Sequence, residues 1–338
     1  MVILMNNFNY LMLFEITYHP LIIATLNIIV VLSILSISFQ IYKSSSGDTV
    51  FQFISINLIF LFILIFFFQF IYYFNFAARF NGKLIFYIIS TIGIFLFFKN
   101  FIVFRKLRIN TSKNTLFIFL FLFLYFLISL STVTDIDSID YHLGIPLEWY
   151  RNEKFLPRYD WLHFRGAGSG EVLNLFGLHF GSDNFGQVIQ FCGLIIIYFS
   201  TRAYLKNEES FPFMILVLSC PLLIFLTSTQ KYQLFTSSLI YFSLILVLIN
   251  NTKYKNLYLF TIISIICFAI TIKVNYLIPG LFLYLICIKS AWENKKIKNL
   301  LFFSIVAFIF FSFPHFYKNF IFYGDPFSPI FEKYKLNP

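Results

Sequence analysis

The chain has 338 residues, of which 59% are hydrophobic, 22% are aromatic and only 12% are charged. A soluble domain carries about 25% charged residues, so this chain has too few charges to cover a water-facing surface. The composition excludes a cytosolic globular enzyme, a disordered chain and a disulfide scaffold, and it predicts an all-α membrane protein. We assign the formal net charge of +10 to loops that orient the helices, and we expect no nucleic-acid partner.

Runs of mostly apolar residues set the expected helices, because about 20 such residues span the hydrocarbon core of a membrane. Four runs precede a polar interval and six follow it, which predicts about ten transmembrane helices. In chain order the runs cover residues 20–42, 51–76, 84–104, 115–133, 184–204, 211–228, 232–250, 257–272, 274–289 and 299–317. We expect an N-terminal membrane region over 1–133, a polar interval over 134–183, and a C-terminal membrane region with an outer tail over 184–338.

The positions of Lys and Arg orient these helices, because cytoplasmic loops carry an excess of both. The first 42 residues contain neither, so we expect the N-terminus to lie outside the cytoplasm. If each run crosses once, most basic residues fall in the connections after the first, third, fifth, seventh and ninth runs. The polar interval then forms a large outer loop after the fourth span. We expect the site on this outer side, periplasmic or extracytoplasmic.

The polar interval is unusually rich in groups that take part in acid–base chemistry. It holds eight of the fifteen acidic residues and three of the five histidines. A loop that only joins two helices needs none of them, whereas binding and catalytic residues are often carried on loops that a rigid scaffold positions. We therefore expect the functional site here.

The interval opens with the motif Asp135-Ile-Asp137-Ser-Ile-Asp140-Tyr-His142. In a helix Asp137 and Asp140 lie three positions apart and share a face. Two close carboxylates at a low-dielectric boundary repel, so the pKa of one should rise and that group becomes a candidate general base. Alternatively, the pair binds a divalent cation with His142 as a further ligand. A third interpretation is that these acids only solvate the end of a membrane helix.

A glycine-rich turn follows, in which His163 and Arg165 precede Glu171. It lacks the Gly-Lys-Ser/Thr sequence and the strand–loop–helix context of a nucleotide-binding P-loop, so that site is excluded. The turn either lines a pocket or only connects two segments.

Two lysines, Lys231 and Lys273, interrupt strongly apolar sequence at the expected outer ends of their helices. A charge at membrane depth is costly and indicates a partner or a ligand. Beside an acidic membrane site, the most useful ligand is a lipid-linked phosphate. The alternative is that both side chains extend to the membrane interface. Further candidates for phosphate contacts are Arg79, Arg158, Arg165 and Lys318.

Taken in order, four stretches resemble the polytopic GT-C glycosyltransferases, especially the family-39-like membrane proteins of bacteria. They read DIDSIDYHLGIPLEWYRNEKFLP, LHFRGAGSGEVLNLFGLHFGSDNFGQVIQF, ITIKVNYLIPG and SFPHFYKNFIFYGDPFSPIF. The last is similar to the family pattern P-x-x-x-[KR]-N…G-[ND]-P-x-x-P. The resemblance covers roughly residues 115–331. The chain departs from the family in having a D-x-x-D pair rather than adjacent acids.

The resemblance implies transfer of a sugar from a polyprenyl-phosphate donor at the outer, periplasmic face of a bacterial inner membrane. Asp140 or Asp137 would be the base or a metal ligand. The remaining substrate-binding candidates are Lys231, Lys273, Arg165, His142, His163 and Glu171. The implied partners are the lipid-linked sugar and membrane lipids, and a divalent cation is the one cofactor left open. A lipid transporter or flippase and a polysaccharide polymerase or ligase are the alternatives.

Overall fold

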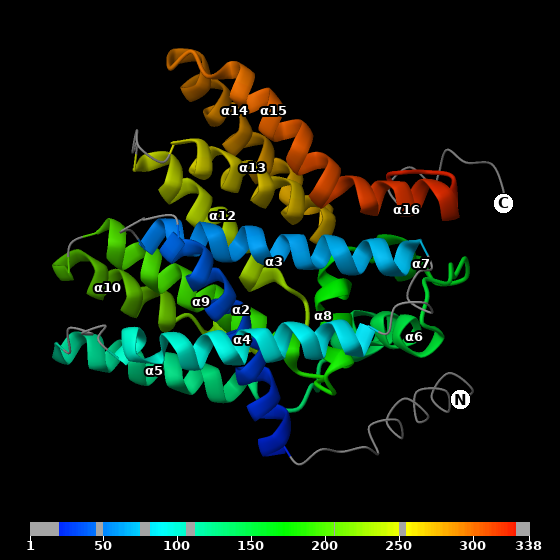
Figure 1. Ribbon diagram of the computed structural model, residues 1–338, viewed down its shortest axis with the longest axis horizontal. Coiled ribbons are helices and arrows are strands. Elements are labelled where there is room, and N and C mark those ends of the chain that lie inside the picture. The colour runs from blue at the N-terminus through cyan, green and yellow to red at the C-terminus, as the bar shows by residue number, and fades with distance from the viewer. Residues whose placement is uncertain are drawn as a thin grey trace.

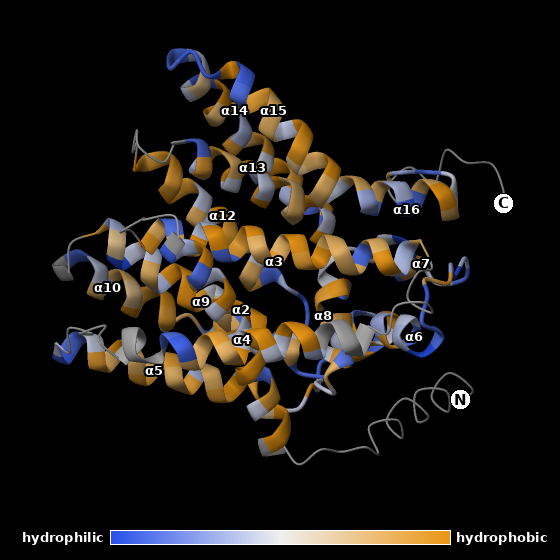
Figure 2. Ribbon diagram, in the orientation of Figure 1, coloured by the Kyte–Doolittle hydropathy of each residue, from blue (hydrophilic) through white to orange (hydrophobic). Residues whose placement is uncertain are grey.

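The computed structural model describes residues 20–44, 50–74, 82–105, 112–205, 207–249 and 255–328. All regular secondary structure within these ranges is helical, which confirms the predicted all-α class. Most helices lie alongside one another, with α6, α7 and α16 at one end (Figure 1). Hydrophobic residues dominate the helices between the two ends, where more hydrophilic residues gather (Figure 2).

The N-terminal part forms four helices that coincide with the first four apolar runs. They are α2 (Pro20–Ser44), α3 (Val50–Tyr73), α4 (Gly82–Arg105) and α5 (Lys113–Ser129). The helix α5 begins where the Ser112 hydroxyl accepts a hydrogen bond from the Thr115 amide at 3.2 Å. This side chain satisfies one of the amides that a helix leaves unpaired at its start.

The C-terminal part contains the remaining six runs. Its helices are α9 (Phe185–Tyr204), α10 (Asn207–Leu218), α11 (Pro221–Thr227), α12 (Gln233–Leu248), α13 (Lys255–Ile272), α14 (Leu277–Glu293), α15 (Ile297–Ala307) and α16 (Phe313–Tyr323). A 3₁₀ turn, η3 (Val274–Tyr276), leads into α14, and a π-helical turn, η4 (Phe308–Ser312), joins α15 to α16. The run 211–228 is broken, because α10 and α11 meet at an angle of 67° just before Pro221.

Five helical stretches within the described residues are long and apolar enough to cross a membrane. They are Ile22–Lys43, Val50–Tyr73, Phe185–Tyr204, Val274–Glu293 and Ile297–Tyr323. The bent pair of α10 and α11 would make a sixth, and four further apolar helices are shorter. The membrane class is therefore supported, whereas ten complete crossings and the sidedness of the polar interval stay predictions.

The polar interval is largely helical, and part of it packs inside the bundle. Its elements are the π-helix η2 (Ser138–Leu143), α6 (Gly144–Asn152), α7 (Leu162–Gly166) and α8 (Ser169–His179). Every residue of α8 is buried, and the helix contacts α3, α6, α9 and α13. The interval is therefore more than a loop outside the helices, because α8 belongs to the core.

Aromatic contacts fix α8 in this position. Phe176 meets Phe68 of α3 edge to face, with ring centroids 5.2 Å apart, and also contacts Phe185 of α9. The buried hydroxyl of Tyr72 lies 2.6 Å from Nε2 of His179 at the end of α8. Because large aromatic side chains contribute much of the apolar area buried in a core, these contacts hold the C-terminal half of α8 at a defined place.

Candidate functional site

The acidic motif lies on the turn that leads from α5 into α6. Asp137 immediately precedes η2, and Asp140 lies within it. A π-helix closes its hydrogen bonds from residue i to i+5, so a three-residue spacing does not give the shared face expected of an α-helix. Accordingly, Asp137 bonds to Lys231, whereas Asp140 is exposed and makes no hydrogen bond or ion pair with the described residues. The structure therefore gives the two carboxylates different surroundings.

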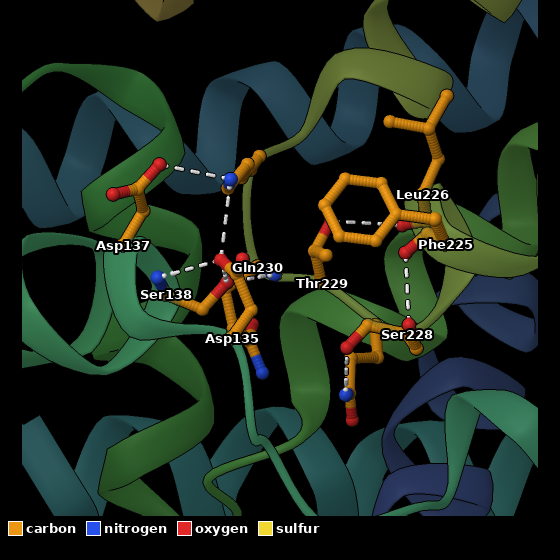
Figure 3. A network of polar contacts seen from close by, with 10 residues as sticks. Asp135, Asp137, Ser138, Phe225, Leu226, Ser228, Thr229 and Gln230 are labelled. Carbon is orange, nitrogen blue, oxygen red and sulfur yellow. Dashed lines mark hydrogen bonds and ion pairs between the residues drawn. The ribbon is translucent and has the colours of Figure 1, made fainter. Parts of the chain in front are cut away.

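Lys231 lies between two carboxylates instead, those of Asp135 and Asp137, which Figure 3 labels. Its Nζ atom is 2.9 Å from Oδ2 of Asp137 and 3.3 Å from Oδ2 of Asp135. The side chain of Lys231 is 14% exposed, that of Asp135 18% and that of Asp137 54%. The predicted partner for this costly lysine is therefore found in the acidic motif itself.

Hydrogen bonds hold Asp135 more firmly than Asp137. Its Oδ2 atom accepts from the backbone amide of Ser138 at 2.9 Å and from the Ser138 hydroxyl at 2.8 Å. Burial acts to raise the pKa of Asp135, but these bonds and the Lys231 ammonium together lower it. Burial likewise acts against the charged form of Lys231, yet its two carboxylate partners raise the pKa of the lysine. Both groups are therefore charged near neutral pH.

The segment before α12 positions Lys231. The backbone amide of Gln230 donates to the Ser138 hydroxyl at 3.0 Å, and the side chain of Gln230 donates to the Asp183 carbonyl at 2.7 Å. Tyr232 has a φ of 55°, which is rare for a bulky residue and turns the chain sharply into α12. Contacts on both sides of Lys231 thus direct it toward η2.

A second cluster joins the end of η2 to the start of α8. Nδ1 of His142 lies 2.8 Å from Oε1 of Glu171, and Oε2 of Glu171 accepts from the Gly168 amide at 2.7 Å. The side-chain amide of Asn174 donates to the His142 carbonyl at 2.7 Å and accepts from the Tyr232 hydroxyl. Because Tyr232 follows Lys231, the two clusters form one connected network.

His163 joins this network through an aromatic contact. Its ring stacks on Tyr141 at a centroid distance of 4.1 Å and an angle of 7°. The Tyr141 ring also lies 4.3 Å from that of His142. Partial burial, followed by the charge of Asp137, raises the pKa of the Tyr141 phenol. His163 is exposed, so it lies at the edge of the site.

Several predicted residues lie apart from this network. Arg165 donates to the Tyr159 carbonyl at 2.8 Å and lies over the Tyr323 ring. Lys273 is exposed, and its ammonium makes no hydrogen bond or ion pair with the described residues. Two further phosphate candidates, Arg158 and Lys318, have protein partners. Arg158 pairs with Glu148 and Asp160, and Lys318 donates to the Ala167 carbonyl at 2.6 Å. Arg79 lies outside the described residues.

The residues suggested for a divalent cation do not fit one. Within the described ranges, no three His, Cys, Asp or Glu side chains are grouped closely enough to hold a metal. His142 bonds to Glu171 and Asp137 bonds to Lys231, so Asp137, Asp140 and His142 do not form a ligand set.

Sequence reasoning missed the residues that connect the two clusters, namely Ser138, Asn174, Gln230 and Tyr232. One signal was available: the stretch Thr227–Lys231 is polar throughout but is flanked by apolar sequence. Such an interruption indicates polar partners in the folded chain.

An apolar cavity lined by Leu246, Tyr258 and Ile262 lies between α12, α13 and α14, and it shares no residue with the site.

Comparison with known proteins places nearly the whole chain in one family. The sequence profile of the DUF1420 N-terminal domain matches residues 2–327. No curated protein and no solved structure matches the chain. The description of the profile names a domain and no activity, so function has to be argued from the site. By this match the chain belongs to the DUF1420 family.

Proposed function

We propose that the protein transfers a sugar from a polyprenyl-phosphate donor to an acceptor hydroxyl at the outer face of a membrane. The observation that carries the proposal is the network around η2. It joins a lysine between two carboxylates to a partly buried His142–Glu171 pair, on the turn that also carries the exposed Asp140. The resemblance to GT-C glycosyltransferases supports the same reaction from the sequence.

The chemistry requires little beyond these groups, because the donor is already activated. The acceptor oxygen attacks the anomeric carbon, its proton passes to a carboxylate, and the bond from that carbon to the phosphate oxygen breaks. The phosphate leaves with the bonding electrons. We assign the base to Asp140, which is exposed and unpaired among the described residues. Lys231 would neutralise the charge that develops on the phosphate.

The position of the network agrees with an outer-face reaction. The C-terminal ends of α3 and α16 and the start of α4 lie at the same end of the molecule as α6 and α7 (Figure 1). The Lys and Arg pattern predicts that this end is outside the cytoplasm. A lipid-linked donor in the outer leaflet would then reach the site from the membrane.

A transfer assay with the full chain in proteoliposomes tests the proposal. A radiolabelled polyprenyl-phosphate sugar is supplied with candidate acceptors, and turnover is compared between wild type, Asp140→Asn and Asp137→Asn. Asp160→Asn is the matched control, because Asp160 is an exposed acid of the same interval that pairs with Arg158 outside the network. We expect a large loss for Asp140→Asn and none for the control. Unchanged turnover in both site variants would contradict the assigned chemistry.

The bent pair of α10 and α11 favours one alternative, movement of the lipid-linked sugar across the membrane. Broken helices near a charged residue are typical of transporter binding sites. Here the break at Ser219–Cys220 precedes the segment that carries Lys231. Flux of a labelled lipid-linked sugar without a new glycosidic bond would favour the transporter, and products extended by many sugar units would favour a polymerase.

A further inference from the structure

The two carboxylates that hold Lys231 are anchored very unequally. Asp135 is mostly buried, and the same Oδ2 atom that contacts Lys231 also accepts two hydrogen bonds from Ser138. Asp137 is 54% exposed and reaches Lys231 through Oδ2 at 2.9 Å. Asp135 therefore keeps its place if Lys231 gains another ligand, whereas Asp137 can leave.

Lys231 also stays in place when Asp137 leaves. Its backbone is held by the contacts of Gln230 and by the start of α12. The Phe225 ring covers the ammonium from another side, at 5.3 Å from its centroid. An ammonium group has three donors, so one can stay with Asp135 while another turns to a new acceptor.

From this asymmetry we infer that Asp137 is a displaceable counter-ion, which a phosphate oxyanion replaces on Lys231 while Asp135 holds the lysine in position. The inference rests on the proposed function and adds a control step to it. Binding of the anion would release the Asp137 carboxylate, so Asp137 would be free of its ion pair with Lys231 only when the donor phosphate is present.

The charges involved favour this exchange. The donor is a phosphodiester with one negative charge, and the polyprenyl phosphate released by the transfer is a monoester with about −1.5 to −2 charges near pH 7 and three strong acceptor oxygens. The carboxylate of Asp137 carries a single charge, and an ion pair with a partner this exposed is worth only about 0.2–1 kcal/mol. The entering anion therefore displaces Asp137 at a small cost in free energy. It then pairs with Lys231, whose side chain is more buried than that of Asp137.

Affinity measurements on the full chain in nanodiscs test the exchange. The probes are inorganic phosphate and a short-chain prenyl monophosphate, with the matching prenyl alcohol as an uncharged control, and binding is followed by calorimetry. If Asp137 competes with the anion, Asp137→Asn should bind the phosphate probe about 1.4- to five-fold more tightly than wild type, the range that such an ion pair is worth. Lys231→Met should bind at least tenfold more weakly.

Asp140→Asn is the matched control for charge alone. It removes one acidic charge from the same turn, but Asp140 has no ion pair with the described residues. If Asp140→Asn tightens binding as much as Asp137→Asn, the gain comes from general electrostatics and the exchange is overturned. A gain confined to Asp137→Asn supports it.

The probes identify the source of the anion and separate this inference from the proposed function. Tighter binding of the prenyl monophosphate than of phosphate supports a lipid donor, and equal binding supports a soluble oxyanion on the same lysine. If neither the prenyl monophosphate nor inorganic phosphate binds, the inference is overturned. Equal affinities of wild type and Asp137→Asn also overturn it, while the proposed transferase still stands or falls with the turnover of Asp140→Asn.

Discussion

Two lysines tie the polar interval to the C-terminal helices, and their surroundings are opposite in character. Lys231 contacts the start of the interval through the carboxylates of Asp135 and Asp137 and is partly open to solvent. Lys318 contacts its middle through backbone carbonyls and is 1% exposed, with the rings of Tyr73 and Phe155 at 5.7 and 5.4 Å.

The difference indicates which lysine serves a ligand. A charge that has a half-exposed carboxylate as its shortest contact can exchange that partner at small cost. A charge enclosed by carbonyls and aromatic rings has no route to a ligand, and removing it leaves buried acceptors unpaired. We therefore assign Lys318 a structural role, although its sequence context had made it a phosphate candidate.

The largest expected effect on stability comes from the close approach of Gly168 to the Thr271 carbonyl. A Cβ atom on Gly168 would lie 1.9 Å from the Thr271 carbonyl oxygen, so Gly168→Ala forces the backbone apart. We expect a destabilisation of about 3 kcal/mol. Thermal unfolding in detergent measures it, with Gly166→Ala as the control, because a Cβ there meets nothing within 4 Å. Equal melting temperatures for the two variants would contradict the close approach.

Lys318→Met should have the next largest effect on stability. The substitution keeps the apolar stem and removes the donor to the Ala167 carbonyl, which then stays buried without this partner. We expect a loss of about 2 kcal/mol, within the usual range for a buried group deprived of its hydrogen bond. The same unfolding measurement applies. A variant as stable as wild type would show that the region tolerates the loss and would remove the contrast with Lys231.

Lys231→Met should change stability by less than about 1 kcal/mol, because its strongest partner is half exposed. Its effect on phosphate binding should nevertheless exceed that of Lys318→Met. The comparison of the two lysines fails if Lys231→Met unfolds at a much lower temperature while phosphate affinity is unchanged.

The smallest effect concerns pH. The pKa of Asp135 is lower in the folded protein than in the unfolded chain, so ionised Asp135 stabilises the fold above the unfolded pKa. This stabilisation is lost as the pH falls below about 4, through the lowered value. The difference in melting temperature between wild type and Asp135→Asn should therefore shrink in acid. A difference that stays constant from pH 7 to pH 3 would exclude the ionised form as its source.

The sequence predicted the helices well, because hydropathy alone determines where apolar runs begin and end. The runs 51–76 and 184–204 correspond to α3 and α9 within a few residues. Burial of α8 was not predictable, because its short polar and apolar stretch becomes core only when α3, α9 and α13 surround it.

The site was predictable only in part. The apolar sequence around Lys231 indicated a partner or a ligand, and the structure shows two carboxylate contacts. The pairing of His142 with Glu171 joins residues 29 positions apart, and no periodicity relates them. The π-helical turn also altered the expected relation between Asp137 and Asp140, since the spacing argument assumed an α-helix.

The contacts at the start of α8 carry a consequence for biosynthesis. The Ser169 hydroxyl bonds to Thr271 of α13, and Gly168 lies against the Thr271 carbonyl, while Lys318 of α16 binds Ala167. These partners leave the ribosome roughly one hundred residues and more after α8 itself. During synthesis, the polar interval therefore lies beside an incomplete bundle, and the contacts of Ala167, Gly168 and Ser169 can form only after α13 and α16 have been made.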